Sequence, residues 1–119
     1  MKPLVVKNET NACFDVDWTL VEACLKTTKG AIKMKDPRTG EDIYFTRYEE
    51  HIDLLKQMKG RGRYIIVWSA AGWQWADAIV KILKIEHLVD QVMTKPLCMV
   101  DDKPIDSWAT QVFLPKTKK

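Results

Sequence analysis

Short apolar runs alternate with amphipathic stretches along the chain, and the runs predict the strands of a sheet. Tyr64–Trp68 is apolar throughout and rich in β-branched and aromatic residues, which is typical of a strand buried on both faces. Ala12–Val16 and Leu97–Val100 have the same character, and Gln91–Thr94 and Val112–Leu114 predict two shorter strands. The pattern therefore predicts a sheet of about five strands.

Helical spacing of apolar residues separates these runs. Thr46 and Glu49 have the spacing of a capping box, which predicts the start of a helix that ends at Gly60. Trp73–Leu83 predicts a second helix and Ile105–Ala109 a short third one. Strands that alternate with helices predict an α/β fold: a three-layer, Rossmann-like, mostly parallel sheet of about five strands with helices on both faces.

A turn-rich segment interrupts this alternation. Ala31–Met34 and Asp42–Phe45 flank the turn at Asp36–Gly40, which predicts a β-hairpin over about residues 30–46. The hairpin follows the first strand, where an open α/β sheet places its ligand, so we expect it to form a flap over the site. A surface hairpin without a role is the alternative. The 119 residues fit one domain over 1–119.

Charge and cysteine content limit the classes of function. The net charge is +3, but Lys116, Lys118 and Lys119 lie in a basic tail over 115–119, and the rest of the chain is neutral. A neutral body gives little support for a nucleic-acid surface. The three cysteines lack the spacing of a disulfide framework or a zinc site. Without a leader or a long apolar segment, we expect a cytoplasmic protein that does not bind membranes, and we infer no obligate protein partner.

Acidic residues follow two of the predicted strands. Asp15 and Asp17 end the first strand, and two residues at this spacing point to the same side. Asp101 and Asp102 directly follow Leu97–Val100. Four carboxylates at one sheet edge would repel each other without a cation, and oxygen ligands favour Mg²⁺. We therefore predict a Mg²⁺ site held by these four acids, although either pair alone is more often a polar turn.

Two further residues complete a pattern suited to phosphate. Ser69 lies between a strand and a helix, where a hydroxyl and free amides suit an anion. Lys95 precedes the strand that leads to Asp101, and its charge could neutralise phosphate. Taken alone, Ser69 is most often a helix cap and Lys95 a solvated lysine.

The order of these motifs resembles the haloacid dehalogenase (HAD) superfamily of phosphotransferases. Asp15-Val16-Asp17-Trp18-Thr19-Leu20 looks like the first motif of that family. Ser69 matches the second motif, Lys95 the third, and Asp101-Asp102 the fourth. The resemblance spans about residues 12–114. Because little chain separates the elements, the protein resembles small capless members, including small phage-type hydrolases and phosphatase domains that act on polynucleotide ends.

The resemblance implies a Mg²⁺-dependent phosphatase. Asp15 would be the nucleophile and Asp17 the general acid and base. Ser69 and Lys95 would bind the phosphoryl group, and Thr19 would brace the first motif and is assigned with them. The substrate would be a phosphorylated small molecule, such as a nucleotide, or a nucleic-acid end.

Trp18 departs from the family pattern, because a small residue usually occupies this position. No arginine follows Ser69, which weakens the polynucleotide alternative. Trp73 and Trp75 lie two residues apart, so one of them, together with Trp18, could face the site and stack on a flat group. Two other functions stay open: a receiver-like phosphoacceptor domain and a non-catalytic binding module on a HAD scaffold.

Overall fold

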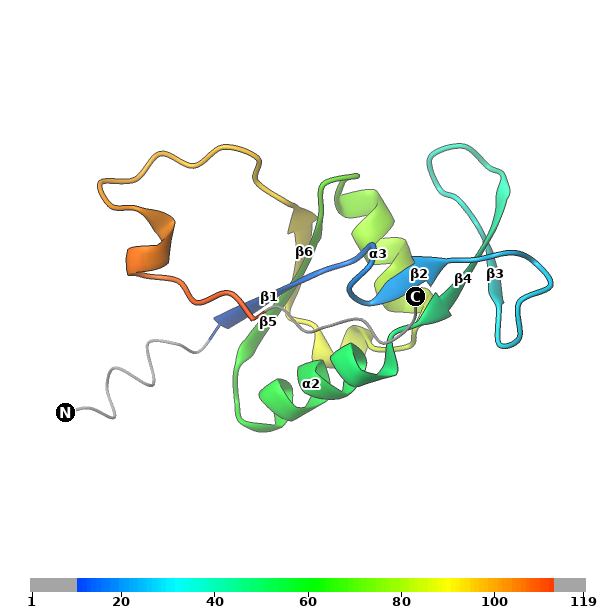
Figure 1. The fold of residues 1–119 in the computed structure, drawn as a ribbon, viewed down its shortest axis with the longest axis horizontal. Coiled ribbons are helices and arrows are strands. Elements are labelled where there is room, and N and C mark those ends of the chain that lie inside the picture. Colours follow the sequence, from blue (N-terminus) through cyan, green and yellow to red (C-terminus); the bar gives the residue numbers. More distant parts are fainter. Residues whose placement is uncertain (1–10, 113–119) are drawn as a thin grey trace.

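A parallel sheet of three strands forms the centre of the structure (Figure 1). The structure is a computed structural model, and it describes residues 11–112. The strands lie in the order β1 (Asn11–Asp15), β5 (Tyr64–Ser69) and β6 (Gln91–Thr94). Asp15 pairs with Trp68, and Ser69 pairs with Thr94, so the carboxyl ends of all three strands meet at one edge.

Both helices contribute to a core on one face of this sheet. α2 (Glu49–Gly60) precedes β5, and α3 (Trp73–Ile82) connects β5 to β6. Because the chain steps from β1 to β5 to β6 in one direction, right-handed crossovers place both helices on the same side. The buried side chains agree, since one core cluster joins both helices to β5 through Ile52, Leu55, Ile65, Val67 and Ile79.

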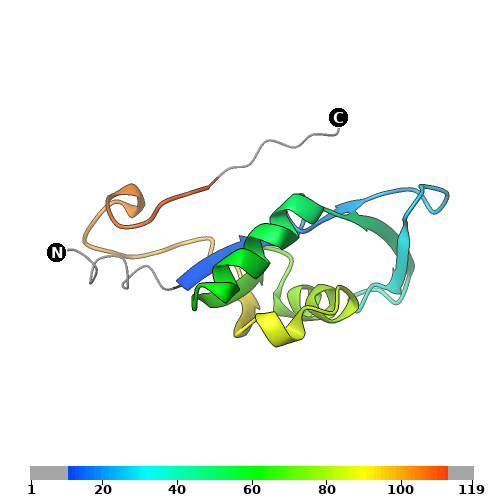
Figure 2. The same ribbon diagram turned by 90° about the horizontal axis from the view of Figure 1, so that it is seen from below.

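A second sheet of three antiparallel strands lies beyond the carboxyl end of β1 (Figures 1 and 2). Its order is β2 (Val21–Ala23), β4 (Asp42–Arg47) and β3 (Ile32–Lys35). β3 and β4 form the predicted hairpin, and β2 is a strand that the sequence pattern did not predict. Val21 and Phe45 are buried in the same core cluster as β5, which anchors this hairpin sheet to the parallel sheet.

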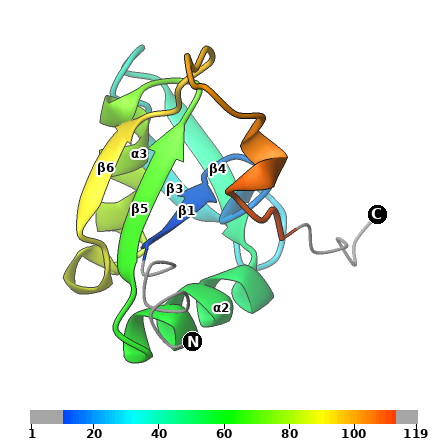
Figure 3. The same cartoon turned by 90° about the vertical axis from the view of Figure 1, so that its left-hand side faces the viewer.

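The predicted fold class is wrong. The described residues form two separate three-stranded sheets, and not one mostly parallel sheet of about five strands with helices on both faces. The face of the parallel sheet opposite the helices has no helical cover, and on it Cys13 is exposed while Ile66 and Trp68 are half-buried. Figure 3 shows the strands of the parallel sheet side by side in the order β6, β5 and β1.

The missing strand explains the error. Leu97–Val100 is irregular, and its ends are open to solvent, with Leu97 80% and Val100 98% exposed. Pro96 directly before the run lacks an amide donor, and four apolar residues are too few to distinguish a strand from a loop by pattern alone. The segment loops away from the sheet (Figure 1), so within residues 11–112 β1 pairs only with β5.

Two boundary predictions also differ from the structure. Thr46 belongs to β4, and the residue that precedes α2 is Tyr48, with no side-chain capping hydrogen bond, so the predicted capping box does not form. The short helix predicted at Ile105–Ala109 is a single 3-10 turn at Ile105–Ser107. The strand predicted at Val112–Leu114 lies mostly outside the described residues.

Candidate functional site

The first motif lies where β1 ends and the chain turns toward the hairpin sheet. Asp15 is the last residue of β1, Val16 is fully buried, and Asp17 follows it. The amides of Thr19 and Leu20 both donate to the Val16 carbonyl, with N···O distances of 3.2 and 2.8 Å. This tight turn holds the two carboxylates at the carboxyl edge of the parallel sheet.

Trp18 lies at the strained point of this turn. Its φ angle is 64°, in the left-handed region that a side chain with a Cβ atom disfavours. Its amide donates to the Val21 carbonyl at 2.8 Å, while its side chain is 52% exposed. Backbone hydrogen bonds, rather than packing of the indole, therefore hold Trp18 in this conformation.

Ser69 and Lys95 lie at the ends of the two strands beside β1. The Lys95 amide donates to the Ser69 carbonyl at 2.9 Å, and the Lys95 ammonium lies 3.9 Å from a carboxylate oxygen of Asp15. Ser69 is 1% exposed, and its hydroxyl oxygen accepts the Ala71 amide at 3.0 Å. A hydroxyl can still donate its own hydrogen, but in this state the group is covered. The structure thus brings together Asp15, Lys95 and the end of β5.

Asp17 has an environment that differs from that of Asp15. Partial desolvation by neighbouring atoms raises the pKa of Asp17, and the nearby Asp15 charge adds to the rise, although the residue as a whole is exposed. The indole N–H of Trp75 donates to Asp17 Oδ1 at 3.2 Å and opposes this rise, as does the charge of Arg38. A carboxyl with a raised pKa is better suited to deliver a proton than an ordinary surface aspartate.

The hairpin reaches the site through Arg38. Its guanidinium lies over the Trp75 ring, 4.5 Å from the centroid, and donates two hydrogen bonds of 2.9 Å to Asp36. These bonds hold the pKa of Asp36 below its usual value. A cavity of about 220 Å³ lies here between the hairpin sheet and α3, and its lining includes Asp17, Arg38, Tyr44 and Trp75.

Thr19 braces the motif through its backbone. The Thr19 carbonyl accepts a hydrogen bond from His51 Nδ1, which assigns the ring hydrogen to that nitrogen. His51 is buried on α2 and its ring stacks on Tyr48, with centroids 5.2 Å apart. No sequence motif pointed to this contact between His51 and the first motif. A contact between the Thr19 hydroxyl and phosphate stays a prediction from the sequence.

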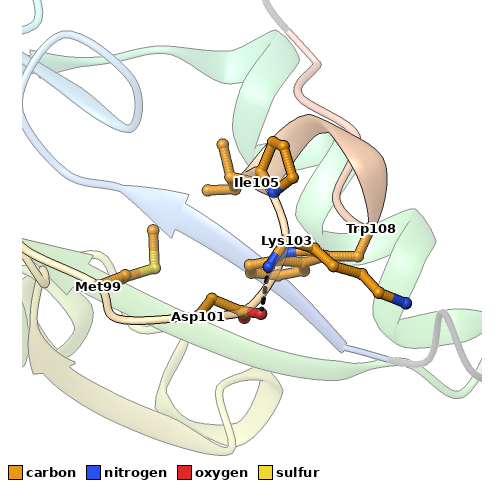
Figure 4. Close-up of a pocket in the computed structure, with 6 residues that line it drawn as sticks. Met99, Asp101, Lys103, Ile105 and Trp108 are labelled. Carbon is orange, nitrogen blue, oxygen red and sulfur yellow. Dashed lines mark hydrogen bonds between the residues drawn. The ribbon is translucent and has the colours of Figure 1, made fainter.

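Asp101 and Asp102 lie on the segment that follows β6, and both side chains are exposed. Asp101 accepts the amide of Lys103 at 3.1 Å and lines a second cavity of about 310 Å³, shown in Figure 4 with Met99 and Trp108. Asp15 and Asp17 do not line this cavity. The prediction that these two acids share an edge with Asp15 depended on a strand at Leu97–Val100, and that strand does not form.

The described acids do not form the predicted metal site. Across residues 11–112, no three histidine, cysteine, aspartate or glutamate side chains are grouped so that they could hold a metal ion. Asp15 faces the Lys95 ammonium instead. Within the described residues Asp15 is therefore not grouped with two further acids, and Mg²⁺ dependence stays a prediction from the sequence.

Sequence reasoning missed the roles of two residues. Trp75 was considered for stacking on a ligand, but it is 5% exposed and binds Asp17, whereas Trp73 is 50% exposed. The helical spacing showed that the two indoles diverge but not which one is buried. The sequence did not indicate a role for Arg38, because an arginine in a hairpin turn is usually a surface residue. Its contact with Trp75 depends on how the hairpin packs against α3.

Comparisons with known proteins do not assign the chain to a family. No protein-family model matches it, and a search of curated proteins finds no match. The resemblance to the HAD superfamily therefore depends on the motif residues alone. Neither helix in the described part of the chain is long and apolar enough to cross a membrane.

Proposed function

We propose that the protein hydrolyses phosphate monoesters through an aspartyl-phosphate on Asp15. The observation that supports this most directly is the meeting of Asp15 and Lys95, with 3.9 Å between the ammonium and a carboxylate oxygen, beside Asp17 with its raised pKa. A carboxylate nucleophile, a cation for the phosphoryl oxygens and an acid with a raised pKa are the groups that such a reaction needs. The order of the motifs in the sequence adds the resemblance to HAD phosphatases.

The proposed reaction has two steps. In the first, an Asp15 oxygen forms a bond to phosphorus while the bond to the leaving oxygen breaks, and Asp17 gives its proton to that oxygen. In the second, water attacks the phosphorus of the aspartyl-phosphate, Asp17 takes a proton from the water, and Asp15 leaves as a carboxylate. Lys95 lies where it would neutralise charge on the phosphoryl oxygens. The Ser69 hydroxyl would have to become accessible to contribute.

Mg²⁺ dependence is part of the proposal, and it would require a further acid near Asp15. Asp101 and Asp102 are the sequence candidates. A bound Mg²⁺ ion would supply charge neutralisation for the phosphoryl group. Titration of activity with Mg²⁺ and with a chelator, in the natural chain and in Asp101→Asn, tests this part separately from the nucleophile.

The experiment that tests the nucleophile is phosphate release from an aryl phosphate, mononucleotides and 3′-phosphorylated oligonucleotides. Asp15→Asn should lower kcat by about 10³-fold or more, because the amide oxygen is a poor nucleophile. Asp53→Asn is the control, since Asp53 is exposed on α2 and lies outside the site. Equal activity in the natural chain and Asp15→Asn would refute the assignment.

The same assay distinguishes the alternative functions. A non-catalytic binding module is favoured by the scattered acids and by Trp18 at the entrance to the turn. It predicts no phosphate release from any of these substrates. A phosphoacceptor domain predicts a stable phosphate on Asp15 after treatment with a small phosphodonor, detected by intact mass, without turnover.

A further inference from the structure

We propose that Trp75 is a positioning residue that fixes the Asp17 carboxyl, so that Asp17 Oδ2 carries the proton given to the leaving oxygen. The proposal rests on the function proposed above, and it adds a residue that none of the sequence motifs contains. It depends on the hydrogen bond of 3.2 Å from Trp75 Nε1 to Asp17 Oδ1.

The chemistry of the indole determines which carboxylate oxygen is free. Tryptophan Nε1–H donates a hydrogen bond and cannot accept one. Asp17 Oδ1 must therefore be an acceptor, whether the carboxyl is ionised or protonated. When Asp17 is protonated, its carbonyl oxygen is a better acceptor than its hydroxyl oxygen, so the bond from the indole favours Oδ1 as the carbonyl oxygen and Oδ2 as the oxygen that carries the hydrogen. The contact thus limits rotation of the carboxyl group and favours Oδ2 for the proton transfer.

Trp75 is itself held firmly. Its side chain is 5% exposed on α3, which packs against β5 and β6. Arg38 from the hairpin covers the ring at 4.5 Å, an arrangement that a guanidinium and an indole favour. Because Asp36 takes two hydrogen bonds from this guanidinium, the charge of Arg38 is already paired. Arg38 is therefore better placed to support Trp75 than to bind a phosphate.

This arrangement connects the hairpin sheet to the proton donor. Arg38 from the hairpin covers one face of the Trp75 ring, and a movement of the hairpin that removes Arg38 would uncover that face. Because Trp75 donates a hydrogen bond to Asp17, such a movement would also affect the residue that positions Asp17. Asp17, Trp75 and Arg38 all line the cavity of about 220 Å³, so the contact that holds Asp17 lies where the hairpin sheet meets α3.

The test uses leaving groups of different basicity. Trp75→Phe keeps most of the buried ring but removes the donor. Tyr64→Phe is the control, because it also removes one side-chain donor but at the start of β5, at the end of the strand opposite Ser69. Dinitrophenyl phosphate releases a stable anion that needs no proton, whereas phenyl phosphate needs one. Trp75→Phe should lower kcat for phenyl phosphate by about tenfold or more and change kcat for dinitrophenyl phosphate less than about threefold. Tyr64→Phe should change neither value.

A merely structural role of Trp75 would lower both rates equally, and that result would overturn the proposal while leaving the Asp15 assignment intact. Absence of turnover in the natural chain would instead remove the proposed function, and this proposal with it.

The contact also has a readout that needs no activity. In a ¹H–¹⁵N spectrum, the indole resonance of Trp75 is the one lost in Trp75→Phe. Asp17→Ala should shift that resonance clearly while the other indole resonances keep their dispersion, which reports an intact fold. An unchanged Trp75 resonance in Asp17→Ala would overturn the proposal whatever the enzyme assays show.

Discussion

Replacement of Trp18 by glycine should stabilise the protein relative to replacement by alanine, which reverses the usual order of these two residues. Trp18 has a φ of 64° and a side chain that is 52% exposed. Both replacements remove the indole, so the loss of its partial packing is almost the same in the two variants. The comparison therefore isolates the backbone conformation of the turn between Asp15 and Leu20.

The expected difference follows from two opposing terms. A residue with a Cβ atom in the left-handed region costs roughly 1–2 kcal/mol, which glycine avoids. Glycine loses about 0.5–1 kcal/mol more than alanine in conformational entropy on folding. The first term is larger, so Trp18→Gly should exceed Trp18→Ala in free energy of unfolding by about 0.5–1 kcal/mol. For a chain of this length, that difference raises Tm by about 2–4 °C.

Urea unfolding at neutral pH measures this difference, and Trp73 supplies the control. Trp73 is 50% exposed and begins α3, where the backbone is helical. At this position alanine should be more stable than glycine by about 1 kcal/mol. The reasoning is refuted if Trp18→Gly and Trp18→Ala show the same order of stability as the Trp73 pair. That result would mean that the turn does not hold Trp18 in the left-handed region.

Two further predictions concern an ion pair and the cysteines. Hydrogen bonds from Lys59 and from a backbone amide lower the pKa of Asp90 below its ordinary value of 3.8. The ionised carboxylate therefore stabilises the fold above about pH 4, and this contribution is lost as the pH falls below about 4 and the carboxylate is protonated. Asp90→Asn should therefore show a weaker acid dependence of the urea midpoint between pH 5 and 3 than the natural chain, and an equal dependence would contradict the assignment. Cys13 is exposed as a residue, but desolvation by its neighbours raises the pKa of its thiol. Cys98 should therefore react faster than Cys13 with iodoacetamide at pH 7.5, as measured by peptide mass spectrometry. A faster reaction at Cys13 would contradict this environment.

Local patterns predicted the elements whose residues make most of their interactions nearby. The apolar run at Tyr64–Trp68 forms β5 with one residue added, and the helical spacing at Trp73–Leu83 forms α3 almost to its end. The hairpin strands also form near their predicted bounds, because a turn with Pro37 and Gly40 restricts the backbone locally. These elements depend on propensity and periodicity, which the sequence displays directly.

Elements that depend on a distant partner could not be predicted in the same way. β2 has only three residues, and it is a strand because β4 offers it an edge. Leu97–Val100 has a stronger apolar pattern than β2, yet it is irregular because no neighbouring strand pairs with it in this structure. The predicted sheet with helices on both faces failed for the same reason.

By itself, the sequence determined the chemical types of the candidate residues and the positions of Asp15 and Asp17 at the end of a strand, since these follow from the order of residues along the chain. The tertiary structure decided their neighbours. It placed Lys95 beside Asp15 and Trp75 on Asp17, and it left Asp101 on a separate segment. Strand pairing and side-chain burial are settled by the packing of residues that are far apart in the chain, and such contacts leave no periodic pattern to read.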